Sequence, residues 1–177
     1  MTLAGAIVIG LIIVFGAGFI YITSRINSLE IASRDRGAEI DSTIWDRTFR
    51  LSKMIEVLRD KDIENDIDVP DTNAFGLGSS PMIQSMRAEQ LDNADRKIRK
   101  ILKEHPELIK EEEFRINLDK FNTARQELFA YSLAYNKCTG AYNSYISNIP
   151  ASFVATLNKK SDRQLFGYIF AELKEEP

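Results

Sequence analysis

The first 24 residues of the chain are MTLAGAIVIGLIIVFGAGFIYITS, and no charged side chain occurs before Arg25. The apolar part, Leu3 to Ile22, matches the roughly 20 residues that a helix needs to cross a hydrocarbon core of about 30 Å. The residues that follow are rich in charge and carry a helical pattern. The sequence therefore predicts an all-α protein with a transmembrane anchor over residues 1–24 and one helical domain over residues 25–177.

A cleaved secretory signal is the alternative for this opening segment. Such a signal has a basic leader, a short apolar stretch and a small-residue cleavage site. Here no Lys or Arg precedes the apolar stretch, which is long and continues into Phe19-Ile20-Tyr21-Ile22. A retained anchor is therefore favoured. Because Arg25, Arg34 and Arg36 follow the segment, the positive-inside rule predicts a single-pass protein of the cell membrane with a cytoplasmic domain.

Small residues recur within the predicted anchor. Ala6 and Gly10 are spaced four residues apart, and Gly16 and Gly18 form a second region of small side chains. Small side chains let helices approach closely in lipid, which predicts packing of the anchor in a homo-oligomer. The alternative is that Gly and Ala are simply common in membrane helices.

The rest of the chain shows helical spacing of apolar residues, interrupted by turn-forming stretches. The longest stripe is expected to need helical partners along its whole length, which favours an antiparallel up-down four-helix bundle with coiled-coil-like packing. Cys138 is expected in its core, and so is Trp45, for which a surface anchor is the alternative. The predicted helices are 26–61, continuous with the anchor and weakest at Gly37, then 81–105, 114–149 and a return helix over 153–173.

Residues capable of catalysis are few. His105 is the only histidine, and His105-Pro106 resembles a helix stop. The alternating acids at residues 62–68 lack the central Gly and terminal Glu of a calcium loop, so a solvated turn is expected and a hydrolase built on these acids is disfavoured. No catalytic residue, metal ligand or cofactor site is predicted. The net charge of −3, with both signs interleaved, argues against a nucleic-acid partner.

A repeated Tyr-Asn pair stands out from this patterning. Tyr135-Asn136 is followed seven residues later by Tyr142-Asn143, so the two tyrosines share one helix face. Buried tyrosine hydroxyls and amides need hydrogen-bond partners, so the pairs are expected to hold neighbouring helices in register.

At these residues the chain resembles the LemA family of bacterial membrane proteins, as a divergent member. The family's early Ile-Asp, with an Arg six residues later, corresponds to Ile40-Asp41 and Arg47. Ile149 stands where the family usually has Phe before proline. The C-terminal signature of the family corresponds to Tyr135-Asn136, Tyr142-Asn143, Ile146, Pro150, Ala155 and Phe166.

The resemblance implies a membrane-tethered helical bundle without established catalysis, associated with homeostasis of the bacterial envelope. Some relatives are associated with membrane proteases or organelle biogenesis. The resulting hypothesis is a non-enzymatic scaffold that assembles with itself or with another membrane protein. The alternative is an accessory or regulatory subunit of a membrane-bound protease.

Overall fold

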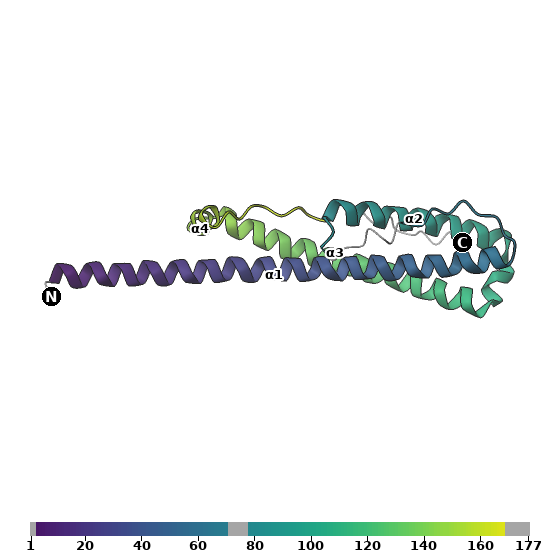
Figure 1. Cartoon of the computed structure of the whole chain (residues 1–177), viewed down its shortest axis with the longest axis horizontal. Coiled ribbons are helices and arrows are strands. Elements are labelled where there is room, and N and C mark those ends of the chain that lie inside the picture. Colours follow the sequence, from purple (N-terminus) through teal and green to yellow (C-terminus); the bar gives the residue numbers. More distant parts are fainter. Residues whose placement is uncertain (1–2, 71–77, 169–177) are drawn as a thin grey trace. The chain divides into compact units, whose positions relative to one another are not determined.

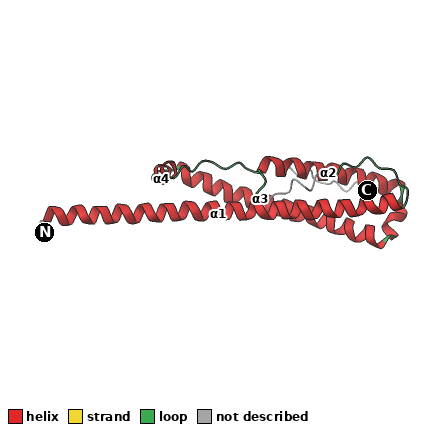
Figure 2. Cartoon of the chain, in the orientation of Figure 1, coloured by secondary structure: helices red, strands yellow, loops and turns green. Residues whose placement is uncertain are grey.

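The computed structural model describes residues 3–70 and 78–168. These residues form helices and loops, with no strand among them (Figure 2). The α-helices are α1 (Leu3–Asp60), α2 (Pro81–Glu104), α3 (Glu112–Ser147) and α4 (Ala151–Leu157), and a short 3-10 helix, η2 (Pro106–Lys110), precedes α3 (Figure 1). The predicted all-α class is confirmed.

Helix α1 is unbroken over its 58 residues. No proline occurs before Pro70, and the helix continues through Gly37, where an added Cβ would lie 3.6 Å from the Tyr135 ring. Its first part is apolar and exposed, and it is long and apolar enough to cross a membrane. The expected continuity between the apolar segment and the following helix is confirmed.

Helix α2 begins and ends where the sequence predicts. The Ser80 side chain accepts a hydrogen bond from the Ile83 amide, and Pro81 occupies the first turn, where its missing N–H costs nothing. His105 caps the other end, and its N–H bonds the Ile101 carbonyl. Helix α3 closely follows the predicted stripe.

The predicted return helix over 153–173 is wrong beyond Leu157. Helix α4 ends there because Lys159 adopts a left-handed conformation with φ of 53°. The Lys159 amide bonds the Thr156 carbonyl and the Lys160 amide bonds the Ala155 carbonyl, which is the Schellman arrangement. Residues 158–168 are not helical. The last part of the predicted helix, including Leu173, lies outside the described residues.

The described residues form two compact units. Of the described residues, the first unit, which we call the anchor unit, comprises 3–35 and 136–165, and the second, which we call the bundle unit, comprises 36–70, 78–135 and 166–168. The predicted domain boundary between residues 24 and 25 falls inside α1 and stays a prediction.

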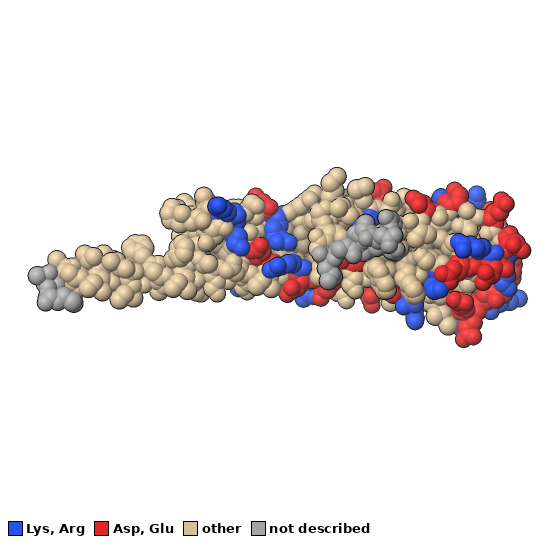
Figure 3. Space-filling view, viewed as in Figure 1, with Lys and Arg blue, Asp and Glu red and all other residues tan. Residues whose placement is uncertain are grey.

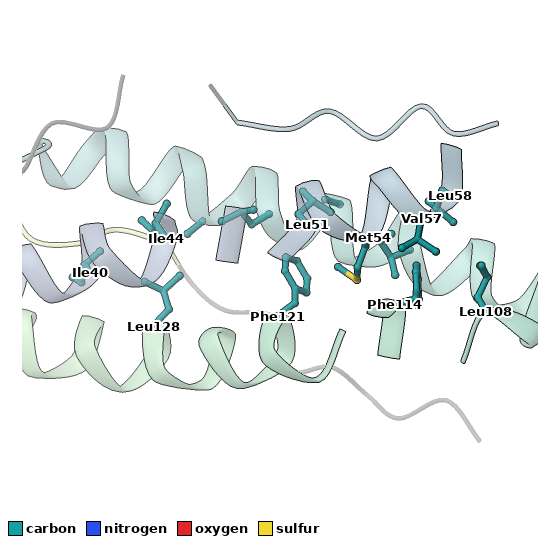
Figure 4. Packing of buried hydrophobic residues seen from close by; sticks show 14 of the residues in the cluster. Ile40, Ile44, Leu51, Met54, Val57, Leu58, Leu108, Phe114, Phe121 and Leu128 are labelled. Atoms are coloured by element: carbon teal, nitrogen blue, oxygen red, sulfur yellow. The ribbon is translucent and has the colours of Figure 1, made fainter. Parts of the chain in front are cut away.

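The bundle unit has an apolar core drawn from α1, α2, α3 and η2 (Figure 4). Leu128 and Phe121 of α3 face Ile44 and Leu51 of α1 within this core, and Phe114 lies beside Met54. It is completed from the C-terminal side by Phe166, which is 4% exposed.

Two side chains expected in the core lie elsewhere. Trp45 is 49% exposed and stacks on Phe49, with ring centroids 5.7 Å apart, so its predicted core position is wrong. Ile44 takes the inward position beside it. Cys138 is half-buried, because Thr139 next to it takes the buried position in the anchor unit.

The anchor unit has a smaller core. Ile26 of α1 packs with Tyr142 and Ile146 of α3, and with Val154 and Ala155 of α4. A buried hydroxyl pair, Ser33 with Thr139, joins α1 to α3 at 2.7 Å.

Candidate functional site

A fully buried arginine is the most unusual feature of the bundle unit. Arg47, on the inward face of α1, has no exposed surface. Its guanidinium lies 4.4 Å from the centre of the Phe121 ring, and its Nη1 lies 2.7 Å from Oδ1 of Asp92 on α2. Because an unpaired buried charge is very costly, the position of Arg47 depends on Asp92.

Asp92 has two further partners besides Arg47. Arg125 of α3 donates from Nε to Oδ1 at 3.1 Å and from Nη2 to Oδ2 at 3.1 Å. The Tyr168 hydroxyl donates to Oδ2 at 2.8 Å. Asp92 therefore ties α1, α2, α3 and the segment after Leu165 to one carboxylate.

A second carboxylate extends this network along α2. Asp95 is buried one turn after Asp92, and its Oδ2 accepts a hydrogen bond from Arg99 Nε at 2.9 Å. The Asp95 charge also acts favourably on Arg47. We call the set formed by Arg47, Asp92, Asp95, Arg125 and Tyr168 the Asp92 network.

The pKa shifts follow from these contacts. Burial lowers the pKa of Arg47, and Asp92 counteracts that effect. Burial alone would raise the pKa of Asp92, but Arg47, Arg125 and Tyr168 outweigh it, and the net direction is downward. Burial together with the hydrogen bond to Asp92 raises the pKa of Tyr168 to about 12. Asp92 is therefore ionised and Tyr168 neutral near pH 7.

This arrangement suits structure better than catalysis. Both oxygens of Asp92 already accept hydrogen bonds or face a guanidinium, so neither is available to remove a proton from a substrate. The tyrosine hydroxyl is held as a donor to the same carboxylate. Charged side chains buried in this way can fix helix register, and we assign that role to the Asp92 network.

The early family-like positions all lie in the bundle unit. Ile40 is fully buried in the core, and Arg47 belongs to the Asp92 network. Asp41 Oδ2 accepts the backbone N–H groups of Gly78 at 3.0 Å and Ser79 at 3.1 Å. Gly78 has φ of 97°, which favours glycine, so Asp41 holds the turn that precedes α2.

The second Tyr-Asn pair holds a non-helical segment rather than a neighbouring helix. Tyr142 donates to the Ser161 carbonyl at 3.2 Å. Asn143 donates to the Arg163 carbonyl at 2.8 Å and accepts the Arg163 N–H at 2.9 Å. These three bonds attach residues 161–163 to α3, and we call them the Tyr-Asn clasp.

The remaining family-like residues are divided between the two units. Tyr135 is buried in the bundle core. Asn136, the next residue of α3, is half-buried and is the first α3 residue of the anchor unit. Pro150 follows a cis peptide bond in the turn before α4. The structure thus brings together subsets of the signature within each unit: Ile40, Tyr135 and Phe166 in the bundle core, and Tyr142, Ile146 and Ala155 in the core of the anchor unit.

The other residues singled out by the sequence are peripheral. His105 caps α2 and contacts Glu107, and Asp66 of the acidic stretch pairs with Lys97 at 2.9 Å. Among residues 3–70 and 78–168, no group of three His, Cys, Asp or Glu side chains could hold a metal ion. An added Cβ at Gly10, Gly16 or Gly18 would meet no atom within 4 Å, and Ala6 is exposed on the same helix.

Sequence reasoning missed most of the Asp92 network. In the sequence, only the family resemblance points to Arg47, and no pattern described above points to Asp92, Asp95 or Tyr168. A signal existed, because Asp92 and Asp95 alternate with the inward-facing Leu91 and Ala94 on α2. Acids within an apolar stripe, opposite an arginine in the stripe of another helix, predict a buried ion pair.

Comparisons of the chain with protein-family models, with curated proteins and with solved structures found no match.

Proposed function

We propose that this chain is a non-enzymatic, LemA-like scaffold anchored in a membrane by the first part of α1. The observation that carries the proposal is the exposure of the apolar segment of α1, which includes Ile12, Val14 and Phe15. Exposed apolar side chains in a continuous helix of this length are stable in lipid and unfavourable in water.

The rest of the proposal follows from charge and packing. Arg25, Arg34 and Arg36 succeed the apolar segment, which favours a cytoplasmic location for the residues after it, at a bacterial cell membrane. Within the bundle unit, α1, α2 and α3 are proposed to run up and down as an antiparallel bundle, with Phe166 and Tyr168 in place of a fourth helix. The Asp92 network fixes their register, which suits a rigid support for assembly.

Self-association through the anchor is part of the proposal. The open surface at Gly10 leaves room for a second helix to approach closely, with Ala6 one turn away. Lipid of the bilayer surrounds this helix contact. The proposed biological process is homeostasis of the cell envelope or membrane.

The decisive experiment is the mass and composition of the full-length protein after light cross-linking in its own membranes and extraction in mild detergent. A homogeneous homo-oligomer supports the scaffold. Gly10→Leu should weaken this oligomer, whereas Val8→Leu, a matched change in the same exposed segment, should not. A monomer under all cross-linking conditions would contradict self-assembly.

An accessory subunit of a membrane-bound protease is the second candidate. It is favoured by the exposed Trp45–Phe49 stack of the bundle unit, with Lys53 6.0 Å from the Phe49 ring, because exposed aromatic side chains are common anchors in protein interfaces. The same extraction distinguishes the two candidates. A complex of fixed ratio with a peptidase, lost in Trp45→Ala, would make this the function.

A further inference from the structure

The outer face of α4 exposes large apolar side chains in the anchor unit, in addition to those of the apolar segment of α1. Ala151, Val154 and Ala155 turn inward. The opposite side carries Phe153, which is 68% exposed, and Leu157, which is 58% exposed. Ile149, in the turn just before α4, is 90% exposed. Large side chains this exposed, and spaced four residues apart, indicate a face that is covered in the working protein.

The position of α4 along α1 shows what covers this face. Val154 and Ala155 pack in one cluster with Ile26, and Ile22 lies against the same cluster. Ile22 is the last residue of the apolar segment, and Arg25 is the first charge of the chain. The exposed Tyr21 side chain marks the same level, where tyrosine is enriched at membrane–water boundaries. Helix α4 therefore lies where α1 would leave the hydrocarbon.

The direction of α4 agrees with this position. Figure 1 shows α4 close to end-on, whereas α1 runs horizontally across the view, so the axis of α4 is steeply inclined to that of α1. A short helix that crosses a transmembrane helix at the boundary has its axis near the membrane plane, as interfacial helices do.

Charge at this boundary is suited to lipid headgroups. Lys159 is exposed directly after α4, and Lys160 and Arg163 lie beside Glu30 of α1. Figure 3 shows Lys and Arg side chains gathered next to the uncharged stretch of α1. Basic side chains beside an apolar face are typical of segments that bind the interface of anionic membranes.

We propose that Ile149, Phe153 and Leu157 insert into the interfacial layer of the bilayer that α1 crosses, so that the chain contacts the membrane at a second place. This inference rests on the proposed membrane anchor. It adds that lipid covers the outer face of α4. The Tyr-Asn clasp supports the contact, because it attaches the segment that follows α4 to α3.

The test measures depth in the bilayer with single tryptophans in the full-length protein. Trp45 is the only tryptophan and is half exposed, so Trp45→Phe provides the background. Phe153→Trp and Leu157→Trp report on α4, and Phe15→Trp reports on the apolar segment of α1. Lys137→Trp is the matched control. Lys137 is exposed on α3, two residues before Thr139, which bonds Ser33 of α1, so it lies on the far side of the proposed membrane boundary from the apolar segment.

The protein is reconstituted in vesicles of phosphatidylcholine and phosphatidylglycerol brominated at defined acyl positions. We expect Phe153→Trp and Leu157→Trp to be quenched several-fold more than Lys137→Trp, and most by bromine close to the headgroup. Phe15→Trp should be quenched most by bromine deep in the chains.

The outcomes separate this inference from the anchor on which it rests. Quenching of Phe15→Trp without quenching at positions 153 and 157 would keep the anchor and overturn the interfacial contact. A blue-shifted but unquenched signal at position 153 would also overturn it, because a second copy or another protein would then cover α4. No quenching at any position would contradict the anchor itself.

Discussion

The two units of this chain are held together by different kinds of interaction. In the described part of the bundle unit, a large apolar core surrounds an ion-pair network centred on Asp92. In the described part of the anchor unit, a small apolar cluster is supplemented mainly by neutral hydrogen bonds, those of Ser33 with Thr139 and of the Tyr-Asn clasp. The ion pairs of Glu30 with Lys160 and Arg163 lie at its partly exposed edge.

This difference has a physical consequence. A buried ion pair is strongly directional, so it specifies which helix faces meet, but it makes stability sensitive to pH and to the loss of one partner. Neutral bonds from side chain to backbone depend little on pH and hold segments that lack regular structure. The bundle unit is therefore expected to behave as a rigid, charge-specified body, and the anchor unit as a locally opening one.

The largest effect is expected at Asp92. Asp92→Ala should destabilise the bundle unit by about 3–5 kcal/mol, because Arg47 then stays buried without its carboxylate. Urea unfolding of the full-length protein in mild detergent, followed by Trp45 fluorescence, measures it. The pKa of Asp92 is lowered in the folded state, so the difference from wild type should be present above pH 3.8 and decline as the pH falls below it.

The control for this change is a partly exposed ion pair in the same unit. Asp46 lies 3.1 Å from Arg50 at the surface of α1, and Asp46→Ala should cost less than about 1 kcal/mol. Equal losses of unfolding free energy in Asp46→Ala and Asp92→Ala would show that burial does not make the Asp92 network more stabilising than a surface ion pair.

In the anchor unit, the largest effect is expected at Tyr142. Tyr142→Ala should cost about 3 kcal/mol, because a fully buried ring is removed from a small core. Hydrogen exchange at residues 161–163 measures this, and their amides should exchange roughly a hundredfold faster. Tyr142→Phe loses only the bond to Ser161 and should cost about 1 kcal/mol. Unchanged exchange in Tyr142→Ala would mean that the clasp is not a stabilising element.

A smaller effect is expected at Tyr168, with a pH dependence opposite to that of Asp92. Tyr168→Phe should cost about 1.5 kcal/mol, since it removes a hydrogen bond to a charged group from a half-buried side chain. The folded-state pKa is raised to about 12, so the contribution should be fully present below pH 10 and lost as the pH rises through 12. Unfolding curves of both proteins that differ equally at pH 8 and pH 12 would contradict this.

The smallest effect is a gain. Lys159→Gly should stabilise the anchor unit by about 0.5–1 kcal/mol, because glycine adopts the left-handed conformation of this helix end without strain. Asp62, with φ of 57°, occupies the same position after α1, and Asp62→Gly should gain less because Asp tolerates this conformation better than Lys. Slower hydrogen exchange around α4 in Lys159→Gly checks the first change. A loss of stability there would show that the lysine side chain makes a needed contact.

The helix ends show which boundaries the sequence could predict and which it could not. The starts and stops marked by Pro81 and by His105-Pro106 follow from proline chemistry and are confirmed. The end of α4 is set by a left-handed Lys159, and because glycine is the usual signal for such an end, the predicted helix ran on into residues 158–173.

Contacts between residues far apart in the chain are the other feature that the sequence could not predict. Arg125 lies within the predicted helix 114–149, but no local pattern shows that its partner is Asp92, 33 residues earlier. The bond from Asn143 to Arg163 was unpredictable for a similar reason, since it depends on a non-helical segment that the sequence assigned to a helix. Patterning predicted the helices, and three-dimensional contacts decided which polar residues meet.

The late position of Tyr168 has a consequence for biosynthesis. The apolar segment of α1 is translated first, and the three helices that carry Arg47, Asp92 and Arg125 follow, whereas Phe166 and Tyr168 emerge from the ribosome only afterwards. At about 5–20 residues per second, several seconds separate the anchor from the tyrosine. If the apolar segment is the proposed membrane anchor, its insertion therefore begins before the Asp92 network is complete, and Asp92 has one hydrogen-bond donor fewer until Tyr168 is made.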